Sequence, residues 1–346
     1  MMNQEFLHRL LCTTSVSGNE VPLQKVVLEE MEQYSHQLYI DGNSNVTAVL
    51  NENSNIRVLL DAHADEVGLM VTCANSSGLL YVAKVGGARL HCWAGQKVRI
   101  LTDRGIVHGA IAMTDACKKE GISAKDLLID IGAVSQKEAE DLVHTGDTVV
   151  LDTDWRMLQN NCICSRALDD KAGVFIVMEA LKKAARQGCT AGVFAVSASG
   201  EETTKRGAHW AAGSIRPDMA IVVDVTFASD APGCSDGDNG RVKLGGGPVL
   251  CHGSINSKPL RKLLEQAAKR CGIQVQHEVT PASTYTDADA IHIKNNGVPV
   301  TLVSIPLRYM HTPAEVGSLN DIQACIDLIA EFLCGLRESV ELNPFE

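Results

Sequence analysis

The chain has 346 residues, of which 45% are hydrophobic and 21% charged. This balance is typical of a folded globular protein and excludes a disordered or fibrous one. At roughly 150 residues per domain, the length predicts about two domains. Lys and Arg total 31 against 42 Asp and Glu, which gives a formal charge of −11. Such a surface repels phosphate groups, so we expect neither nucleic acid nor an anionic membrane as the main partner.

The chain contains 12 scattered cysteines, and its start lacks the basic stretch and apolar run of a secretory signal. We therefore expect reduced thiols and a cytoplasmic protein. Cys162 and Cys164 are the one close pair, and no second pair completes a zinc site, so we interpret them as structural thiols. No run of 18 apolar residues occurs, so the sequence predicts no membrane-spanning helix.

The first 66 residues have the pattern of an α/β protein. Two amphipathic helices are predicted over residues 5–14 and 20–34, followed by a β-hairpin over residues 37–50. Residues 56–66, IRVLLDAHADE, then predict a buried strand that ends in polar residues. This placement is informative because ligands of α/β proteins gather at the carboxyl ends of strands.

The pattern changes between Gly68 and Asn161, where short β runs follow one another with glycine or charged turns between them. The runs cover residues 68–74, 79–87, 96–103, 106–113, 126–133 and 147–152. One helical candidate, residues 135–144, interrupts them. This pattern is typical of a small, mostly antiparallel β domain or barrel.

The α/β pattern returns after Asn161. The predicted order is helix 168–188, strands 191–199 and 219–226, helix 258–272, strand 299–306 and helix 320–336. The simplest organisation is an α/β domain made of residues 1–67 and 162–346, into which a β domain of residues 68–161 is inserted. Several strands of the insertion lie far from every polar motif, so we expect it to serve assembly. The alternative is a lid that shapes a pocket.

Polar residues interrupt the apolar strands and helix starts at five places. These are the stretches DAHADE, ALDDK, SGEETT, VVDVT and RYMHTP. Taken singly, each has an ordinary explanation as a helix cap or a hydrogen-bonded core residue. Together they indicate a site, because burying this much charge is costly unless something such as a metal ion compensates.

Two of the stretches suggest how the side chains are arranged. His63 and Asp65 are two residues apart, so on an extended segment they face the same way, and the carboxylate can orient a metal-bound imidazole. Glu201 and Glu202 are adjacent and point in opposite directions on an extended segment. One of them can therefore bind a metal ion while the other faces a water molecule.

The complete set of donors favours a metal centre. Asp169, Asp224 and His311 add two carboxylates and one imidazole to the residues above. Nitrogen and oxygen donors without thiolate suit zinc, cobalt or manganese. The number of donors suits two ions that share one carboxylate. From spacing alone, the function is that of a dimetal hydrolase.

These motifs, in this order, resemble the dimetal aminopeptidases that assemble as tetrahedral (TET) particles, a family that includes glutamyl aminopeptidases and FrvX-like metallopeptidases. The resemblance spans nearly the whole chain through HADEVGLMV, ALDDKAG, the Glu pair followed by RGA, DVTFASDAPG, LGGGPVL, TDADAI and YMHTPAEV. It implies a mixed-sheet, phosphorylase/hydrolase-like exopeptidase domain with an inserted small β-barrel. It also implies peptide substrates with a free N-terminus, and homo-oligomers in which dimers build a dodecamer.

The resemblance further implies a role for each residue. Two divalent ions per subunit are expected, zinc or cobalt, with manganese as a further candidate. One ion would be held by His63, Asp169 and Asp224, and the other by Asp169, Glu202 and His311. Glu201 is the implied general base, which takes a proton from a water and passes it to the leaving amine. Asp65 is the implied residue that orients His63.

The chain departs from the family pattern at a few positions, which we expect around the substrate pocket. They are Ala64, Ser199-Gly200, Thr203-Thr204 and Thr284-Tyr285. The preferred N-terminal side chain of the substrate is therefore not predicted, and the label "glutamyl" is not carried over.

Three alternatives remain open at the level of the sequence. A glycosidase needs two carboxyl groups about 5–10 Å apart and no metal, so its mechanism would leave both His residues without a role. A catalytically inactive binding protein would lack a base or a ligand, and none is missing here. Other dimetal hydrolases, which remove C-terminal residues or acyl groups, fit the spacing of the donors equally well.

Overall fold

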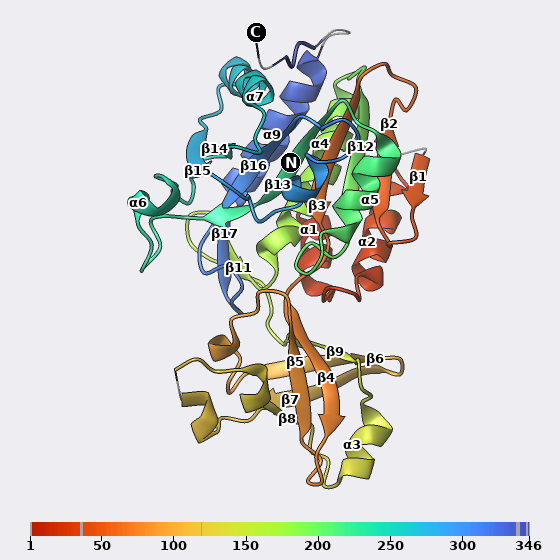
Figure 1. Ribbon diagram of the computed structural model, residues 1–346, viewed down its shortest axis with the longest axis vertical. Coiled ribbons are helices and arrows are strands. Elements are labelled where there is room, and N and C mark those ends of the chain that lie inside the picture. Colours follow the sequence, from red (N-terminus) through yellow and green to blue (C-terminus); the bar gives the residue numbers. More distant parts are fainter. Residues whose placement is uncertain (1, 35–36, 119, 337–339, 344, 346) are drawn as a thin grey trace.

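A mixed β-sheet lies at the centre of the larger part of the molecule (Figure 1). The computed structural model describes residues 2–34, 37–118, 120–336, 340–343 and 345. Within these residues, eight strands form the sheet in the order β1-β2-β12-β3-β13-β16-β14-β15. Their bounds are β1 Gln37–Ile40, β2 Val46–Leu50, β12 Gly192–Ala198, β3 Arg57–His63, β13 Met219–Phe227, β16 Val300–Leu307, β14 Val249–Gly253 and β15 Gln276–Thr280.

The four central strands β12, β3, β13 and β16 run parallel, so their carboxyl ends meet at one edge of the sheet. Helices cover both faces, and the neighbours Leu59 and Leu60 accordingly belong to two different apolar cores. One core contains α1 Gln4–Cys12, α2 Val21–Met31, α4 Leu168–Arg186, α7 Lys258–Cys271 and α9 Leu319–Gly335. The other contains α5 Arg206–Ile215 and α8 Ala288–Ile291. Burial on both faces explains why these strands are continuous apolar runs in the sequence.

A closed β-barrel forms the second part of the molecule and projects from the carboxyl-end side of the large sheet (Figure 1). Its strands follow the order β4-β5-β8-β7-β6-β9, and all pairs are antiparallel. Their bounds are β4 Gly68–Ala74, β5 Leu80–Val85, β8 Leu128–Asp130, β7 Gly105–Ile111, β6 Lys97–Thr102 and β9 Thr148–Leu151. The barrel encloses its own apolar core, against which α3, Gln136–Leu142, packs through Ala139.

A small sheet lies where the chain returns from the barrel. Within the described residues it consists of β10 Arg156–Met157, β11 Cys162–Ser165 and β17 Glu315–Ser318. Strand β11 pairs with β17 along its full length, so the segment that leaves the barrel is bound to the C-terminal third of the chain. The two connections between the parts lie close together at their ends, because Leu69 pairs with Val149 and Arg166 donates to Glu66.

The structure confirms the predicted helices and strands, within a few residues at their ends, and the mixed sheet with an inserted barrel. It adds elements that the sequence did not predict, namely α5, α6 (Asp236–Asn239), α8, β10, β11, β14, β15 and β17. Each of the 12 cysteines, all within the described residues, is a free thiol, as expected. In the part of the chain that the structure describes, no helix is long and apolar enough to cross a membrane.

A buried ionic cluster lies in the larger part of the molecule, beside the two connections to the barrel. Glu66, two residues before the barrel begins, accepts hydrogen bonds from Arg166 and from Lys171, whose Nζ lies 2.7 Å from the Glu66 carboxylate. The same Nζ donates to the carbonyl oxygen of Thr13 at 2.6 Å, and Glu66 accepts the backbone N–H of Ser15 at 3.0 Å. Burial alone raises the pKa of Glu66, but Arg166 and Lys171 outweigh it and lower the pKa to about 2. Four segments therefore meet at one carboxylate.

We expect Glu66→Gln to lower the free energy of unfolding by about 3–5 kcal/mol, because it leaves two buried cations without their counter-charge. Urea unfolding followed by circular dichroism measures this. The matched control is Asp154→Asn, which removes an ion pair with Arg156 whose two side chains are 74% and 68% exposed and should change the midpoint little. An equal shift in both variants would show that the cluster contributes no more than a surface pair.

Candidate metal centre

The predicted site residues meet at the carboxyl ends of the parallel strands. His63 ends β3, Asp224 lies near the end of β13, and the Glu pair follows β12. His311 follows β16, and Asp169 lies at the start of α4, where its backbone is not yet helical. Six of the seven predicted residues line one cavity of about 380 Å³. The six are His63, Asp169, Glu201, Glu202, Asp224 and His311.

Asp169 lies between the two imidazoles. Its Oδ1 is 3.1 Å from Nε2 of His63, and its Oδ2 is 3.0 Å from Nε2 of His311. Nε2 of His311 is also 3.3 Å from Oε1 of Glu202. Each oxygen of one carboxylate thus faces a different imidazole, which is the geometry of a bridging ligand.

Asp65 does not line the cavity, but it contacts both His63 and the Glu pair. His63 Nδ1 is 3.0 Å from the Asp65 carbonyl oxygen and 3.5 Å from its Oδ1. The Asp65 carboxylate accepts the backbone N–H groups of Glu201 at 3.0 Å and Glu202 at 3.1 Å. This fully buried side chain therefore positions the ring of His63 and the segment that carries the Glu pair.

Two further acidic residues belong to the site and were missed from the sequence. Asp170 accepts the backbone N–H of His63 at 3.3 Å and that of Gly173 at 3.1 Å. Glu315 accepts the backbone N–H of Asp169 at 3.2 Å and that of His311 at 2.7 Å. The second Asp of LDDK and the Glu four residues after His311 were the available signals, but nothing in the sequence shows which backbone groups they reach.

The ligating atoms form two overlapping groups. Within each, one atom per residue lies within 4.8 Å of the others. The groups are His63–Asp169–Glu202 and His63–Asp170–Asp224. The sequence prediction instead grouped Asp169 with His63 and Asp224 at one ion, and Asp169 with Glu202 and His311 at the other. The structure places all of these residues together but also brings Asp170 into the second group.

The charges in the cavity are not balanced by protein groups alone. Burial raises the pKa of Asp224 to about 7 and raises that of Glu201 well above its usual value. Burial by itself lowers the pKa of His311, but hydrogen bonds to Asp169 and Glu202 outweigh it and raise the pKa to about 11. Oε1 of Glu201 is buried with no hydrogen-bond partner among the described residues, and the buried Oε1 of Glu202 faces the His311 imidazole at 3.3 Å. Several buried carboxylates beside two imidazoles fit divalent cations that accept nitrogen and oxygen donors.

Some of the positions at which the chain departs from the family pattern lie in the remaining wall of the cavity. Thr284 and Tyr285 line the cavity, as expected, whereas Ala64 is fully buried and does not line it. Ser199-Gly200 and Thr203-Thr204 do not line this cavity either, and Thr203 and Thr204 are exposed.

A salt bridge holds this wall next to the Glu pair. Asp289 accepts hydrogen bonds from the backbone N–H of Thr284 at 2.8 Å and from Lys205 Nζ at 2.9 Å. Lys205 Nζ is also 3.7 Å from Oε1 of Glu201. The loop that carries Thr284 and Tyr285 is therefore fixed relative to Glu201.

The connection after barrel strand β5 also reaches the site. The carbonyl oxygen of Gly87 is 3.2 Å from Nδ1 of His311. A Cβ atom on Gly87 would lie 2.8 Å from two atoms of the His311 ring. The close approach requires glycine, so the inserted part contributes to the orientation of a site imidazole.

We expect Gly87→Ala to displace His311 and to weaken binding of a divalent cation by about 10- to 100-fold, the usual effect of disturbing the support of a ligand. Equilibrium dialysis with Zn²⁺ or Co²⁺ measures it. Gly42→Ala is the matched control, because a Cβ at Gly42 meets no atom within 4 Å. Unchanged binding in Gly87→Ala would show that His311 tolerates the shift.

The fold and the donor set together define a metal-dependent hydrolase with a mixed α/β sheet. The comparisons with known proteins identify its family. Residues 44–328 match the sequence profile of the M42 glutamyl aminopeptidases, and the chain belongs to this family. It is therefore a peptide-bond hydrolase of the aminopeptidase class.

Individual relatives resemble the chain over nearly its whole length. An aminopeptidase of Acetivibrio thermocellus is 34% identical, over 95% of this chain and 98% of that protein. The structure of a TET aminopeptidase from Thaumarchaeota archaeon SCGC AB-539-E09 superposes with a TM-score of 0.91 and 32% identity, over 96% of both chains. The TET1 peptidase of Pyrococcus horikoshii, which can assemble into a tetrahedron or a large octahedral shell, has a TM-score of 0.86 and 28% identity, over 96% and 99%.

Proposed function

We propose that the enzyme uses two divalent cations to remove N-terminal residues, one at a time, from peptides with a free α-amine. The observation that carries this proposal is Asp169, whose two oxygens face His63 and His311 at 3.1 and 3.0 Å. One carboxylate placed in this way can serve two ions at once. Nitrogen and oxygen donors favour zinc or cobalt, with manganese as a further candidate.

The proposed ligands are the five residues of the sequence prediction. They are His63, Asp169, Glu202, Asp224 and His311. When bound, the cations would polarise the scissile carbonyl and make a water more acidic. Asp65 keeps His63 and the Glu pair in place through the contacts described above. Asp170 is 3.3 Å from the backbone of His63 and offers a further oxygen near Asp224.

Glu201 is the proposed general base. Its carboxylate lines the cavity, and its Oε1 has no hydrogen-bond partner among the described residues, so it is free to accept a proton from an attacking water. The same oxygen can then deliver the proton to the leaving amine. Lys205, 3.7 Å away and held by Asp289, restricts where this carboxylate can move.

The acidic residues of the cavity also explain the proposed need for a free amine. Asp169, Glu201, Glu202 and Asp224 line the same space, and a terminal amine can satisfy one of these acceptors, whereas an acetylated one cannot. An unpaired buried carboxylate costs on the order of 1–3 kcal/mol. We therefore expect acetylated peptides to be cleaved about 10- to 100-fold more slowly than free ones.

The experiment follows matched free and N-acetylated peptides by time-resolved mass spectrometry, with the enzyme loaded with Zn²⁺ or Co²⁺. Free peptides should shorten by one N-terminal residue at a time. Glu201→Gln is the control, and it should retain the metal but lose about 10²- to 10⁴-fold in turnover. Equal cleavage of both peptides, internal cuts, or a Glu201→Gln enzyme of normal activity would contradict the proposal.

We further propose that residues 68–161 mediate assembly, whereas residues 1–67 and 162–346 carry the catalytic site (residues 1, 35–36, 119, 337–339, 344 and 346 lie outside the described part). The barrel has a group of large apolar side chains that are at least one third exposed. They are Tyr81, Ile106, Met113, Val134 and Leu142. Burial of such side chains between subunits would be favourable. The tetrahedral assembly of the similar TET1 peptidase supports dimers that build a dodecamer.

Light scattering at micromolar concentration tests the assembly. We expect a multi-subunit particle for the wild-type chain and smaller species for Ile106→Asp, because a charge at a side chain that is 50% exposed would disfavour burial in an interface. A wild-type chain that is monomeric and fully active would contradict the proposal.

A further inference from the structure

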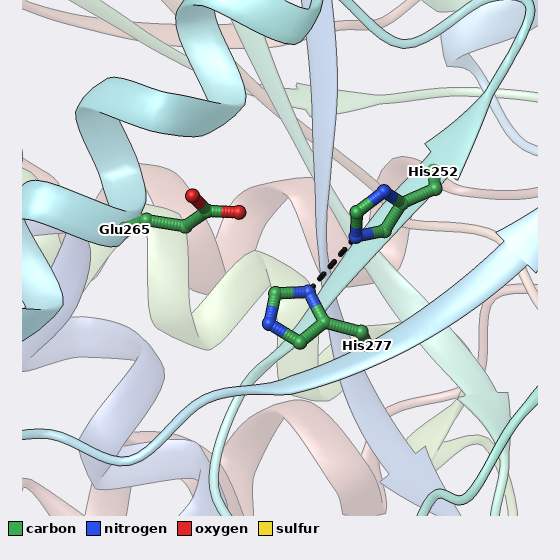
Figure 2. A group of neighbouring side chains, drawn as sticks. All are labelled: His252, Glu265 and His277. Carbon is green, nitrogen blue, oxygen red and sulfur yellow. Dashed lines mark hydrogen bonds between the residues drawn. The ribbon is translucent and has the colours of Figure 1, made fainter.

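A second group of potential ligands lies outside the catalytic cavity, at the edge of the large sheet. His252 is on β14, His277 is on the edge strand β15, and Glu265 is on helix α7. Figure 2 shows the two imidazoles in contact and the carboxylate of Glu265 extending from the helix toward them. Nε2 of His252 is 3.0 Å from Nδ1 of His277. None of these residues lines the catalytic cavity.

The geometry resembles that of a metal site before a cation enters. One ligand atom of each residue lies within 4.8 Å of the other two. Two nitrogen ligands of a tetrahedral zinc ion, each about 2.0–2.1 Å from the metal, are about 3.4 Å apart. The two ring nitrogens therefore need to separate by only a few tenths of an ångström. The three residues come from three packed elements, so their relative positions are held by the fold.

The local charges allow a cation to bind. Burial lowers the pKa of His252, and the neighbouring Arg261 and His277 lower it further, so the imidazole is neutral near pH 7 and can act as a ligand. Arg261 forms an ion pair with Oε1 of Glu265. The carboxylate of Glu265 would also contribute negative charge beside the two rings.

We propose that His252, Glu265 and His277 bind one divalent transition-metal ion of the zinc, cobalt or nickel class. Two imidazoles select against Mg²⁺ and Ca²⁺, which prefer oxygen ligands. Such an ion would join β14, β15 and α7. Glu278, the next residue of β15, is buried and lines the catalytic cavity, whereas His277 is exposed on the opposite face of the strand. The ion would therefore stabilise the strand that forms one wall of the cavity without contacting the substrate.

The test counts bound metal. The enzyme is stripped with a chelator, dialysed against Zn²⁺, and its metal content per chain is measured for wild type, His252→Ala, His277→Ala and the control His144→Ala, an exposed residue of the inserted part. We expect one ion fewer in His252→Ala and His277→Ala than in wild type and the control. The loss of one ion per chain in these variants does not depend on how many ions the catalytic centre holds. If the two-metal assignment of the catalytic centre were wrong, the metal content of every variant would change equally, and the loss would remain one ion.

Glu265→Gln provides a second variant, which removes the charge and leaves both rings. Glu265→Gln should weaken the affinity of the additional site for Zn²⁺ at least tenfold. In a separate measurement, Zn²⁺ should raise the thermal midpoint of the stripped His277→Ala variant less than that of stripped wild type. Equal metal content in wild type and both His variants would overturn the proposal and leave the two rings as a hydrogen-bonded pair.

Discussion

The carboxylate of Glu66 is the point on which the geometry of the active site depends. It holds Arg166 on the chain that returns from the barrel, Lys171 on α4, and the backbone of the N-terminal segment. Asp65 immediately precedes Glu66, and Asp169 lies two residues before Lys171. Because the cluster is fully enclosed, its members cannot separate without exposing unpaired charge to an apolar interior. The proposed bridging ligand and the residue that orients His63 are thereby fixed relative to each other.

Other buried carboxylates around the cavity also support neighbouring residues and do not line the cavity themselves. Carboxylates that do not face the cavity accept backbone N–H groups of the residues that do, as Asp65 does for the Glu pair and Glu315 for Asp169 and His311. Such hydrogen bonds to charged acceptors are stronger than those between neutral groups. The side chains that line the cavity therefore extend from backbone segments that these hydrogen bonds fix in position. Glu201, whose buried Oε1 has no hydrogen-bond partner among the described residues, is one of the carboxylates that line the cavity.

The sequence predicted the central strands because parallel strands buried on both faces are continuous apolar runs, and the barrel because its strands are short and separated by turns. It missed β15, since QHEVT is a mostly polar segment at the sheet edge, and α5, whose small residues give little periodic signal. The sequence indicated which polar residues gather at the strand ends, because charges interrupt apolar runs there. The sequence could not show which of these residues contact one another, because such contacts join distant segments. Glu315, for example, lies 146 residues from Asp169, whose backbone N–H it accepts.

The contact between Gly87 and His311 has a consequence for how such a protein can be modified. An inserted domain that only mediates assembly could be exchanged for another, or deleted, while the host enzyme continued to work. Here the insertion supplies part of the scaffold for an imidazole of the host, and it does so through a backbone without a side chain. Chimeras between relatives would therefore have to inherit the barrel and the segment around His311 together, so the two parts are constrained to change as one unit.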